Sequence, residues 1–431
     1  MIAVARRFRS IGVPLLPLLA LAAPPLHASG FAIDNQGVRA MGFAGAYVAQ
    51  ASDPSAIFFN AAGVAFLKER QIYLSGGLGS LGTDFTAEGP NPIAGTGEKT
   101  KRLLTVLPSI YYTHQVSERL VLGVGFNSPF GYRSEWQNPD AFTGRFICLD
   151  CEIRSWGLNP TLAYRIEDRL AVGVGLDVRF STFRLSQRLL ASPNPFPVPT
   201  DVAELTIDGG TDMGMGFNVG LLASPSETVS IGLAYRHKVK ATYDGTADFT
   251  QILTGNAAVD ALVAAGLQPH QAAQVAHYFP GHFAAGIAIR PGKWTVEGDV
   301  AWTFWSAFDE VALAFPQTPT LNTSLPQNYE NVLQGRVGLE YLLSERWAVR
   351  GGYSYDRGPQ PTETVSPFLH DSNRHGVGLG ASWKQGSLRL DFMGRYLRFR
   401  SRSTGGSNRY DYNGRYDTDS FQLGIALSQR F

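Results

Sequence analysis

Strict alternation of apolar and polar positions recurs along most of this chain. The clearest example is the segment from Ser420 to Phe431, where large apolar residues fill most odd positions and small or polar residues the even ones. A period of two over this length predicts a β-strand with one apolar and one polar face. A strand that ends on an aromatic residue is typical of outer-membrane barrels, so we expect the apolar face to meet lipid.

The same pattern predicts strand after strand from Gln71 onward. The fold class expected is all-β, an antiparallel transmembrane β-barrel of about 14 strands. The expected strands are 71–80, 102–115, 119–127, 152–166, 169–184, 204–223, 228–249, 281–290, 294–305, 331–343, 346–356, 374–383, 387–400 and 416–431.

Connections between these strands alternate between short and long. Short turns follow at 116–118, 167–168, 224–227, 291–293, 344–345 and 384–386, and long loops lie between them at 81–101, 128–151, 185–203, 250–280, 306–330, 357–373 and 401–415. Short periplasmic turns and long external loops are typical of outer-membrane barrels, whereas a soluble β-sandwich would not sort its loops by length.

One long loop has a helical pattern. Residues 256–278 predict two short amphipathic helices on the external face. Apolar side chains there are costly in water unless they meet an apolar ligand. We expect external capture of such a ligand by Val259, Leu262, Val263 and Leu267.

Alternation also assigns the facing of charged residues. In strand 169–184, Val174 and Leu176 face lipid while Asp177 and Arg179 face the lumen. The lumen receives both charge signs, and most such charges are expected to pair and brace the barrel. An arginine outside such pairs would suit a carboxylate head group. The candidates by parity are Arg179, Arg236, Arg336 and Arg350.

The first residues predict a leader. Arg6, Arg7 and Arg9 precede an apolar stretch at 11–26, and small residues follow near Ala28. We interpret residues 1–28 as a secretory signal peptide, since its prolines and short length disfavour a membrane anchor. Residues 29–70 are rich in glycine and alanine and carry no strand pattern.

Composition narrows the class further. The formal charge is +1, and residues 29–431 carry −2, which implies no nucleic-acid partner. Beyond the leader the sequence has no apolar run of about 18 residues, so only a closed barrel would satisfy the backbone in lipid. Cys148 and Cys151, the two cysteines, are expected to form a loop disulfide. Without a second cysteine pair we expect no metal site, and no cofactor is predicted.

Three stretches resemble the FadL/TodX family of outer-membrane transporters for long-chain fatty acids and hydrocarbons. They are the N-terminal residues 29–46 with 53–63, the run 126–131 with 144–146 and 158–165, and the run 299–306. The family hallmark Asn-Pro-Ala is Asn60-Ala61-Ala62 here, so the proline is missing. The hatch residues that match are Phe58, Phe59, Asn60, Ala61, Ala62 and Gly63.

The resemblance implies an architecture and a location. Residues 29–70 would be a hatch that plugs the lumen, and residues 71–431 the barrel, in the outer membrane of a Gram-negative bacterium. A hydrophobic ligand would leave sideways beside a kinked third strand, here 119–127, with its kink at Gly123, Gly125, Asn127 and Pro129. Partners implied are hydrophobic small molecules, outer-membrane lipids and lipopolysaccharide, and the barrel assembly machinery through the Phe431 strand.

Uptake of long-chain fatty acids is the function predicted. The alternative is an aromatic or aliphatic hydrocarbon channel of the toluene type. A general diffusion porin would need no apolar plug, and a TonB-coupled receptor needs a much larger one. A barrel enzyme such as a lipase needs a Ser/His pair, and no serine motif accompanies His237.

Overall fold

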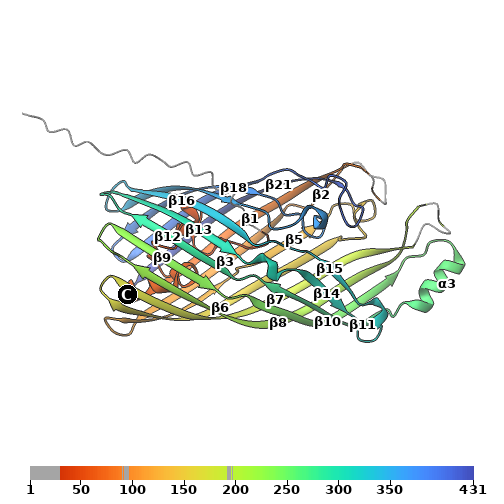
Figure 1. Cartoon of the computed structure of the whole chain (residues 1–431), viewed down its shortest axis with the longest axis horizontal. Helices are drawn as coiled ribbons and strands as arrows, with labels where there is room; N and C mark the ends of the chain where they lie inside the picture. Colours follow the sequence, from red (N-terminus) through yellow and green to blue (C-terminus); the bar gives the residue numbers. More distant parts are fainter. Residues whose placement is uncertain (1–29, 90, 92–96, 192–195, 197) are drawn as a thin grey trace, which may run out of the picture.

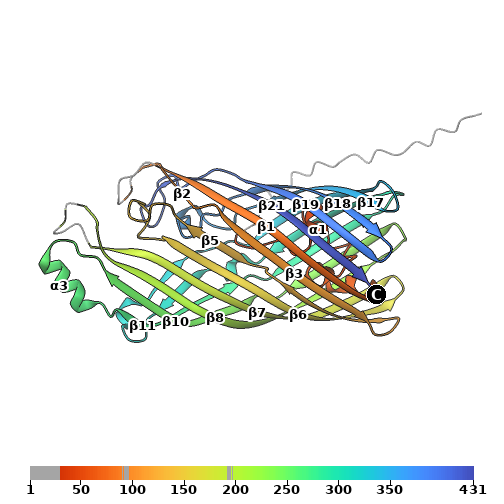
Figure 2. The same cartoon turned by 180° about the vertical axis from the view of Figure 1, so that it is seen from behind.

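The strands of the computed structural model form one closed antiparallel sheet, seen from two sides in Figure 1 and Figure 2. The structure describes residues 30–89, 91, 97–191, 196 and 198–431, so the predicted signal peptide lies outside the described residues. Within the described chain, fourteen strand paths surround the lumen, which confirms the predicted fold class. Their order is β1 (Arg70–Ala87), β3 (Leu103–Gln115), β4 (Leu120–Asn127), β6 (Asp150–Glu167), β7 (Leu170–Ala191), β8 (Thr200–Ala223), β9 (Val229–Arg236), β12 (His282–Ile289), β13 (Trp294–Thr303), β16 (Val332–Leu342), β17 (Trp347–Asp356), β18 (Arg374–Gln385), β19 (Leu388–Phe399) and β21 (Gly414–Arg430).

The last strand closes the barrel against the first. Tyr73 of β1 lies opposite Ser428 of β21, and the backbone N–H of Phe431 donates to the carbonyl of Arg70 at 3.0 Å. Closure leaves neither strand as an open edge, which is the condition for a sheet to span lipid.

Facing follows the predicted alternation. On β7, Val174 and Leu176 expose 49% and 45% of their surface, whereas Asp177 and Arg179 expose 1% each. Apolar side chains thus point outward to lipid and charged ones inward. Among the described residues, no helix has the length and apolar character needed to cross a membrane.

One side of the wall continues far past the apolar band. The sheet extends through β10 (Val239–Gln251), β11 (His270–Phe279), β14 (Glu310–Ala314) and β15 (Thr323–Pro326), alongside the outer parts of β7 and β8. Helix α3 (Ala257–Gly266) sits at the far tip of this extension, at the end opposite the C-terminus (Figure 1).

Two predictions in this region are wrong. The expected strand 228–249 is two strands, β9 and β10, because β9 stays in the wall with β12 while β10 leaves it to pair with β8 and β11. The expected second helix of loop 256–278 is β11, in which Gln271, Ala273 and Val275 are buried at every second position. Pairing with β10 satisfies this backbone, so a helix is not needed.

Shorter elements line the external loops. They are β2 (Gly97–Lys99), β5 (Gly131–Glu135), β20 (Arg402–Ser403) and the 3₁₀ turns η2 (Trp305–Ala307), η3 (Pro319–Leu321) and η4 (Thr362–Thr364). Several predicted loops are therefore partly strand. Aromatic side chains of the loops and of the strand ends beside them pack together in one cluster, with Trp136 stacked on Phe142 at 4.4 Å and Phe85 on Tyr412 at 4.7 Å.

Residues 30–69, here called the N-terminal segment, lie within the ring of strands. Their helices are α1 (Val38–Gly42), α2 (Ala56–Phe59) and the 3₁₀ helix η1 (Ala61–Phe66), and most of their side chains are buried. The segment touches nearly opposite walls, because a Cβ at Gly173 of β7 would collide with Ala61 and one at Gly352 of β17 with Phe43. Glycine at these strand positions lets the segment's backbone approach the wall.

Candidate functional site

The third strand continues past its predicted end at residue 127 and is interrupted between β4 and β5. Asn127 lies opposite Gly157 of β6, and Gly131 lies opposite Arg154, so four steps along this strand match three along β6. The extra residue is a β-bulge, which bends a strand and sends the following side chains to the opposite face. Even-numbered Val124 before the bulge faces outward, whereas even-numbered Phe130, Ser134 and Trp136 after it are buried.

The bulge separates this strand from its other neighbour, β3. Ile110 pairs with Phe126 on one side of the break and Thr100 bridges Trp136 on the other, both in the same register. Between 103 and 109, the described residues give β3 no ladder partner on this side. The two strands therefore part and meet again, leaving a gap in the wall.

Exposure of the lipid-facing side chains marks this gap. Leu104 and Val106 of β3 expose 68% and 63%, whereas Leu74 and Leu78 of the fully paired β1 expose 41% and 43%. A strand with neighbours on both sides shields its side chains more, so the excess exposure reports the missing neighbour.

The N-terminal segment supplies hydrogen bonds to the broken strand from inside. The N–H of Ile33 donates to the carbonyl of Pro129 at 2.9 Å. The side-chain amide of Gln36 donates to the carbonyl of Ser128 at 2.6 Å and accepts from its N–H at 3.1 Å. Backbone groups that the bulge removes from the sheet are thus satisfied by the segment.

The predicted kink residues play different parts here. Gly123 and Gly125 lie in the regular, paired portion of β4, where added Cβ atoms would come within 2.8 Å of Ile57 and 2.7 Å of Tyr111. They make room for inner side chains. The interruption itself begins after Asn127 and contains Pro129, which has no N–H to donate to a ladder.

A cavity of about 500 Å³ lies between the N-terminal segment and the gap. Its lining includes outward-facing Leu104 and Val106, so it reaches the gap. Apolar side chains form much of its wall, among them Phe31, Ile33, Leu103, Leu107, Phe130 and Leu397.

Charged side chains form the cavity's inner end. Arg395 is 1% exposed, its Nη2 lying 3.1 Å from Ser354 Oγ and 3.5 Å from Asp34 Oδ2. Arg374 also lines the cavity, and its Nε donates to Asp356 Oδ2 at 3.1 Å. The inward parity of Arg395 is visible in the sequence, but Asp34 lies in a segment without periodicity and no pattern could place it.

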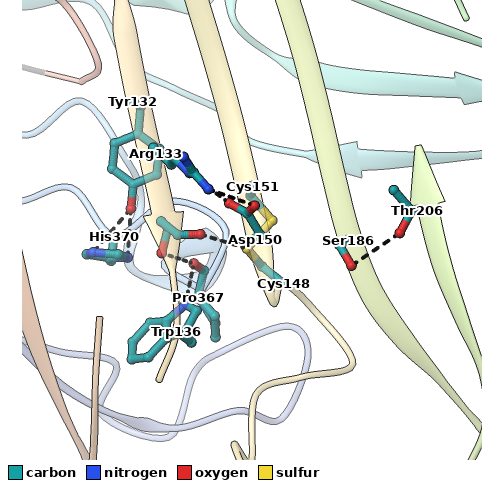
Figure 3. Close-up of a disulfide and its surroundings, with 11 residues drawn as sticks. Tyr132, Arg133, Trp136, Cys148, Asp150, Cys151, Ser186, Thr206, Pro367 and His370 are labelled. Carbon is teal, nitrogen blue, oxygen red and sulfur yellow. Dashed lines mark hydrogen bonds and ion pairs between the residues drawn. A yellow bond between two sulfur atoms is a disulfide. The ribbon is translucent and has the colours of Figure 1, made fainter. Parts of the chain in front are cut away.

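A second charged group surrounds the outer end. Arg133 donates to Asp150 at 3.0 Å, as Figure 3 shows, and Arg154 lies 2.5 Å from Glu152. These pairs are partly exposed, where an ion pair contributes at most about 1 kcal/mol. The cavity is therefore apolar along its length and charged at both ends.

Two of the predicted arginines share one carboxylate. Arg179 and Arg236 donate to Asp177 Oδ2 at 2.6 and 2.9 Å. The guanidinium of Arg179 lies 4.8 Å from the ring centre of Phe130, and its Nε and Nη1 make no hydrogen bond within the described chain. Because Phe130 lines the cavity, one ring separates Arg179 from it.

The other two are also paired. Arg350 contacts Glu340 at 2.8 Å and Asp391 at 3.1 Å, and Arg336 donates to Asp34 at 3.2 Å. In the described part of the chain, none of the four predicted arginines lines the cavity. Their head-group role stays a prediction.

The predicted hatch motif sits deep in the barrel. The guanidinium of Arg236 lies 4.9 Å from the ring centre of Phe58, and Phe59 packs edge-on against Tyr47 at 5.6 Å. Asn60 precedes η1, whose first residues, Ala61, Ala62 and Gly63, are buried.

The predicted capture residues lie far from the cavity. They belong to or follow α3, at the tip of the extension, and Leu262 is 74% exposed while Val259, Val263 and Leu267 are partly buried. The external end thus presents apolar side chains to solvent, and Leu267 packs against the aromatic cluster that also contains Phe31 and Phe130 of the cavity wall.

Cys148 and Cys151 form a disulfide at the start of β6 (Figure 3). Cys151 lies opposite Ser134 of β5, and both cysteines are fully buried. The bond therefore supports the outer loop behind the strand that borders the gap.

Comparisons with known proteins agree with this architecture. Residues 19–431 match the model of the outer membrane protein transport protein family (OMPP1/FadL/TodX). The chain is 28% identical over 405 residues to the outer membrane protein NMB0088 of Neisseria meningitidis serogroup B, covering 85% of each chain. It is 21% identical over 333 residues to the long-chain fatty acid transport protein of Escherichia coli O6:H1, covering 72% of this chain and 73% of that one.

Solved structures share the fold. A FadL homologue of Pseudomonas aeruginosa superposes with a TM-score of 0.81 at 20% identity, covering 94% of this chain and all of that one. The toluene transporter TodX of P. putida gives a TM-score of 0.71 at 17% identity, covering 94% and 99%. Because the family model spans nearly the whole sequence, the chain belongs to the OMPP1/FadL/TodX family of outer membrane transport proteins.

Proposed function

We propose that this protein takes up hydrophobic small molecules, with long-chain fatty acids as the first candidates, and releases them sideways into the membrane. The observation that carries the proposal is the cavity, which is apolar in the middle, charged at its inner end and continuous with the gap beside β3. Burial of each CH₂ in such a wall is worth about 0.8 kcal/mol, so a long chain gains affinity without hydrogen bonds.

The N-terminal segment acts as the plug in this proposal. It is buried inside the ring of strands and makes hydrogen bonds to the interrupted strand. Transport in this proposal therefore does not use a straight, water-filled path along the lumen. The gap gives an apolar molecule a route that avoids both water and the polar outer surface. Arg395 and Arg374 are the cations that the cavity offers a carboxylate.

A hydrocarbon channel is the second candidate. The arginines at the inner end already have carboxylate partners, so an uncharged ligand would fill the cavity without displacing any ion pair. Relatives in both substrate classes share the fold, since the neighbours include a toluene transporter and a FadL homologue.

Removing the bulge tests lateral release. Deletion of Ser128 restores equal step counts opposite β6 and should let the strand pair with β3 across the gap, with a one-residue shift at the bridge that Thr100 now makes to Trp136. We expect radiolabelled oleate uptake by cells expressing this variant to fall to the empty-vector level, while the purified protein still binds oleate. Deletion of Gly405, in an open external loop, is the matched control and should leave uptake unchanged.

Each result has a separate meaning. Uptake by the Ser128 deletion at the normal rate would contradict the lateral route. Wild-type protein that accelerates neither oleate nor toluene entry over the empty vector would contradict the proposed function as a whole.

A further inference from the structure

The inner end of the cavity already contains a carboxylate. Asp34 Oδ1 accepts from Arg336 Nη2 at 3.2 Å, and its Oδ2 lies 3.5 Å from Arg395 Nη2. The Asp34 side chain is 11% exposed and lines the cavity together with Arg395. A carboxylate of the chain thus occupies the place that the head group of an acidic ligand would take.

These two arginines have one acidic partner in common. Among the described residues, Asp34 is the only acid within 4 Å of either guanidinium. Their other side-chain partners are neutral: Gln334 accepts from Arg336 at 2.9 Å and Ser354 from Arg395 at 3.1 Å. The Nε atoms of both arginines make no hydrogen bond within the described chain. Asp34 therefore supplies the negative charge that neutralises this arginine pair.

Arg374, the neighbouring charged side chain, does not depend on Asp34 in the same way. Arg374, the third arginine of this end, has its own carboxylate, since its Nε donates to Asp356 at 3.1 Å. Asp356 is fully buried and does not line the cavity, whereas Asp34 does. A ligand in the cavity therefore meets Asp34 directly.

We propose that Asp34 is a specificity-determining residue that competes with the carboxylate of an acidic substrate for Arg395, the cavity-lining member of the arginine pair that Asp34 neutralises. This inference rests on the proposed function and assigns the substrate preference of the same cavity. A fatty acid must displace Asp34 from Arg395 and leave a buried carboxylate without this partner, which costs free energy. An uncharged hydrocarbon pays no such cost. Asp34 thus weakens acid binding selectively.

Replacement of Asp34 by asparagine tests the competition. Asp34→Asn keeps the shape but leaves both arginines without a counter-charge, so the substrate carboxylate at Arg395 becomes their anion. Charged hydrogen bonds regained in this way should tighten oleate binding by roughly tenfold or more. Toluene binding by the same purified protein should stay within about twofold. Thermal unfolding provides a second readout, because oleate should raise the melting temperature of D34N more than that of the wild type.

Three further variants serve as controls. Asp34→Glu retains the carboxylate and should bind oleate as the wild type does. Asp201→Asn removes an acid from Arg145, a pair outside the cavity lining, and should change the binding of neither ligand. If D34N does not fold, Arg395→Gln tests the same site. Oleate binding by this variant should weaken about tenfold, with toluene binding unchanged.

The outcomes separate this inference from the proposed function. Equal or weaker oleate binding by a folded D34N would overturn it, as would equal changes for oleate and toluene. Oleate binding that is unaffected by R395Q would also overturn it. In each of these cases wild-type uptake through the gap would still stand, whereas a wild type that transports neither ligand contradicts the function itself.

Discussion

The side-chain amide of Asn60 donates to the backbone carbonyl of Leu221 on β8 at 3.1 Å and so fastens the N-terminal segment to the wall. The same amide donates to the carbonyl of Val48 at 2.9 Å, and its oxygen accepts from the N–H of Ala62 at 3.1 Å. A Cβ at Gly220 would collide with the Asn60 oxygen, so glycine is required there. Asn60 thus caps η1 and anchors it at once.

The geometry next to Asn60 predicts that Ala61→Pro is tolerated. Ala61 is the first residue of η1, where proline costs no helical hydrogen bond, and Asn60 is extended, with φ −159° and ψ 103°, close to the region that a residue before proline prefers. We expect unchanged or higher stability, by up to about 1 kcal/mol. Thermal unfolding, followed by the gel shift of folded barrel, measures it.

Ala65→Pro is the matched control for this change. Ala65 lies inside η1, where proline costs about 3 kcal/mol or more. A lower melting temperature for Ala61→Pro than for Ala65→Pro would contradict the assignment of Ala61 to the first helical position.

Two carboxylates of β13 hold another part of the N-terminal segment. Asp299 accepts from the N–H groups of Tyr47 and Val48 at 2.7 and 3.0 Å, and Glu297 from those of Ala49 and Gln50 at 2.6 and 3.2 Å. The backbone N–H groups of four successive residues thus donate to two buried carboxylates. Loss of either acid leaves buried N–H groups without acceptors, at about 1–3 kcal/mol each.

We therefore expect the double variant Glu297→Ala/Asp299→Ala to loosen the plug. Conductance across planar bilayers should rise well above the wild-type level and approach that of a protein deleted for residues 30–69. Glu310→Ala, at an exposed position of β14, is the control and should conduct as the wild type does. Low conductance in both the double variant and the deletion would contradict the proposal that the N-terminal segment plugs the lumen.

The disulfide is expected to have no part in transport. Cys148 and Cys151 are separated by three positions, so the ring restrains little of the unfolded chain and adds little stability. Replacing both by serine should leave oleate uptake within about twofold of the wild type, with a modestly lower melting temperature. Abolished uptake in a folded double variant would show that the outer loop controls entry to the cavity.

Alternation allowed prediction of the wall but not of its interruption. Val174 and Asp177 could be assigned from sequence because lipid and lumen demand opposite side chains on one strand. The break at Ser128 directly follows the expected strand 119–127, between the kink candidates Asn127 and Pro129, yet its cause is one extra residue opposite β6 rather than Gly123 or Gly125. A bulge depends on the partner's register, which a single strand does not contain.

Two features explain the remaining differences between the sequence predictions and the structure: the alanine content of β11 and contacts that form only in the folded barrel. Residues 270–279 alternate, but Ala272, Ala273 and Ala276 suit a helix as well as a strand and hide the period. Inward parity identified lumenal arginines correctly as a class, since Arg179 and Arg350 are buried. It could not tell which of them reaches the cavity, because Asp34 and Arg395 are brought together by the tertiary fold alone.

Buried His370 is expected to make the external loops sensitive to acid. Its ring lies 2.8 Å from Thr83 Oγ1 and 3.1 Å from the hydroxyl of Tyr132 (Figure 3), and it stacks on Tyr416. Burial lowers the pKa of His370 from 6.5 to about 4, because the imidazolium form would lose its hydration. The folded loop therefore binds fewer protons than the unfolded loop between these pH values. Its stability is full above about pH 6.5 and falls as the pH drops toward 4.

Protease cleavage within loop 357–373 should therefore become faster as the pH falls from 7 to 4.5, measured with an acid-tolerant protease. His370→Asn removes the titrating group and should flatten this pH dependence, although the loop loses some packing. His270→Asn is the matched control, because His270 is exposed at the far end of β11 and its loss should leave the dependence intact. A cleavage rate that rises equally with acid in the wild type and in H370N would show that another group causes the loop to open.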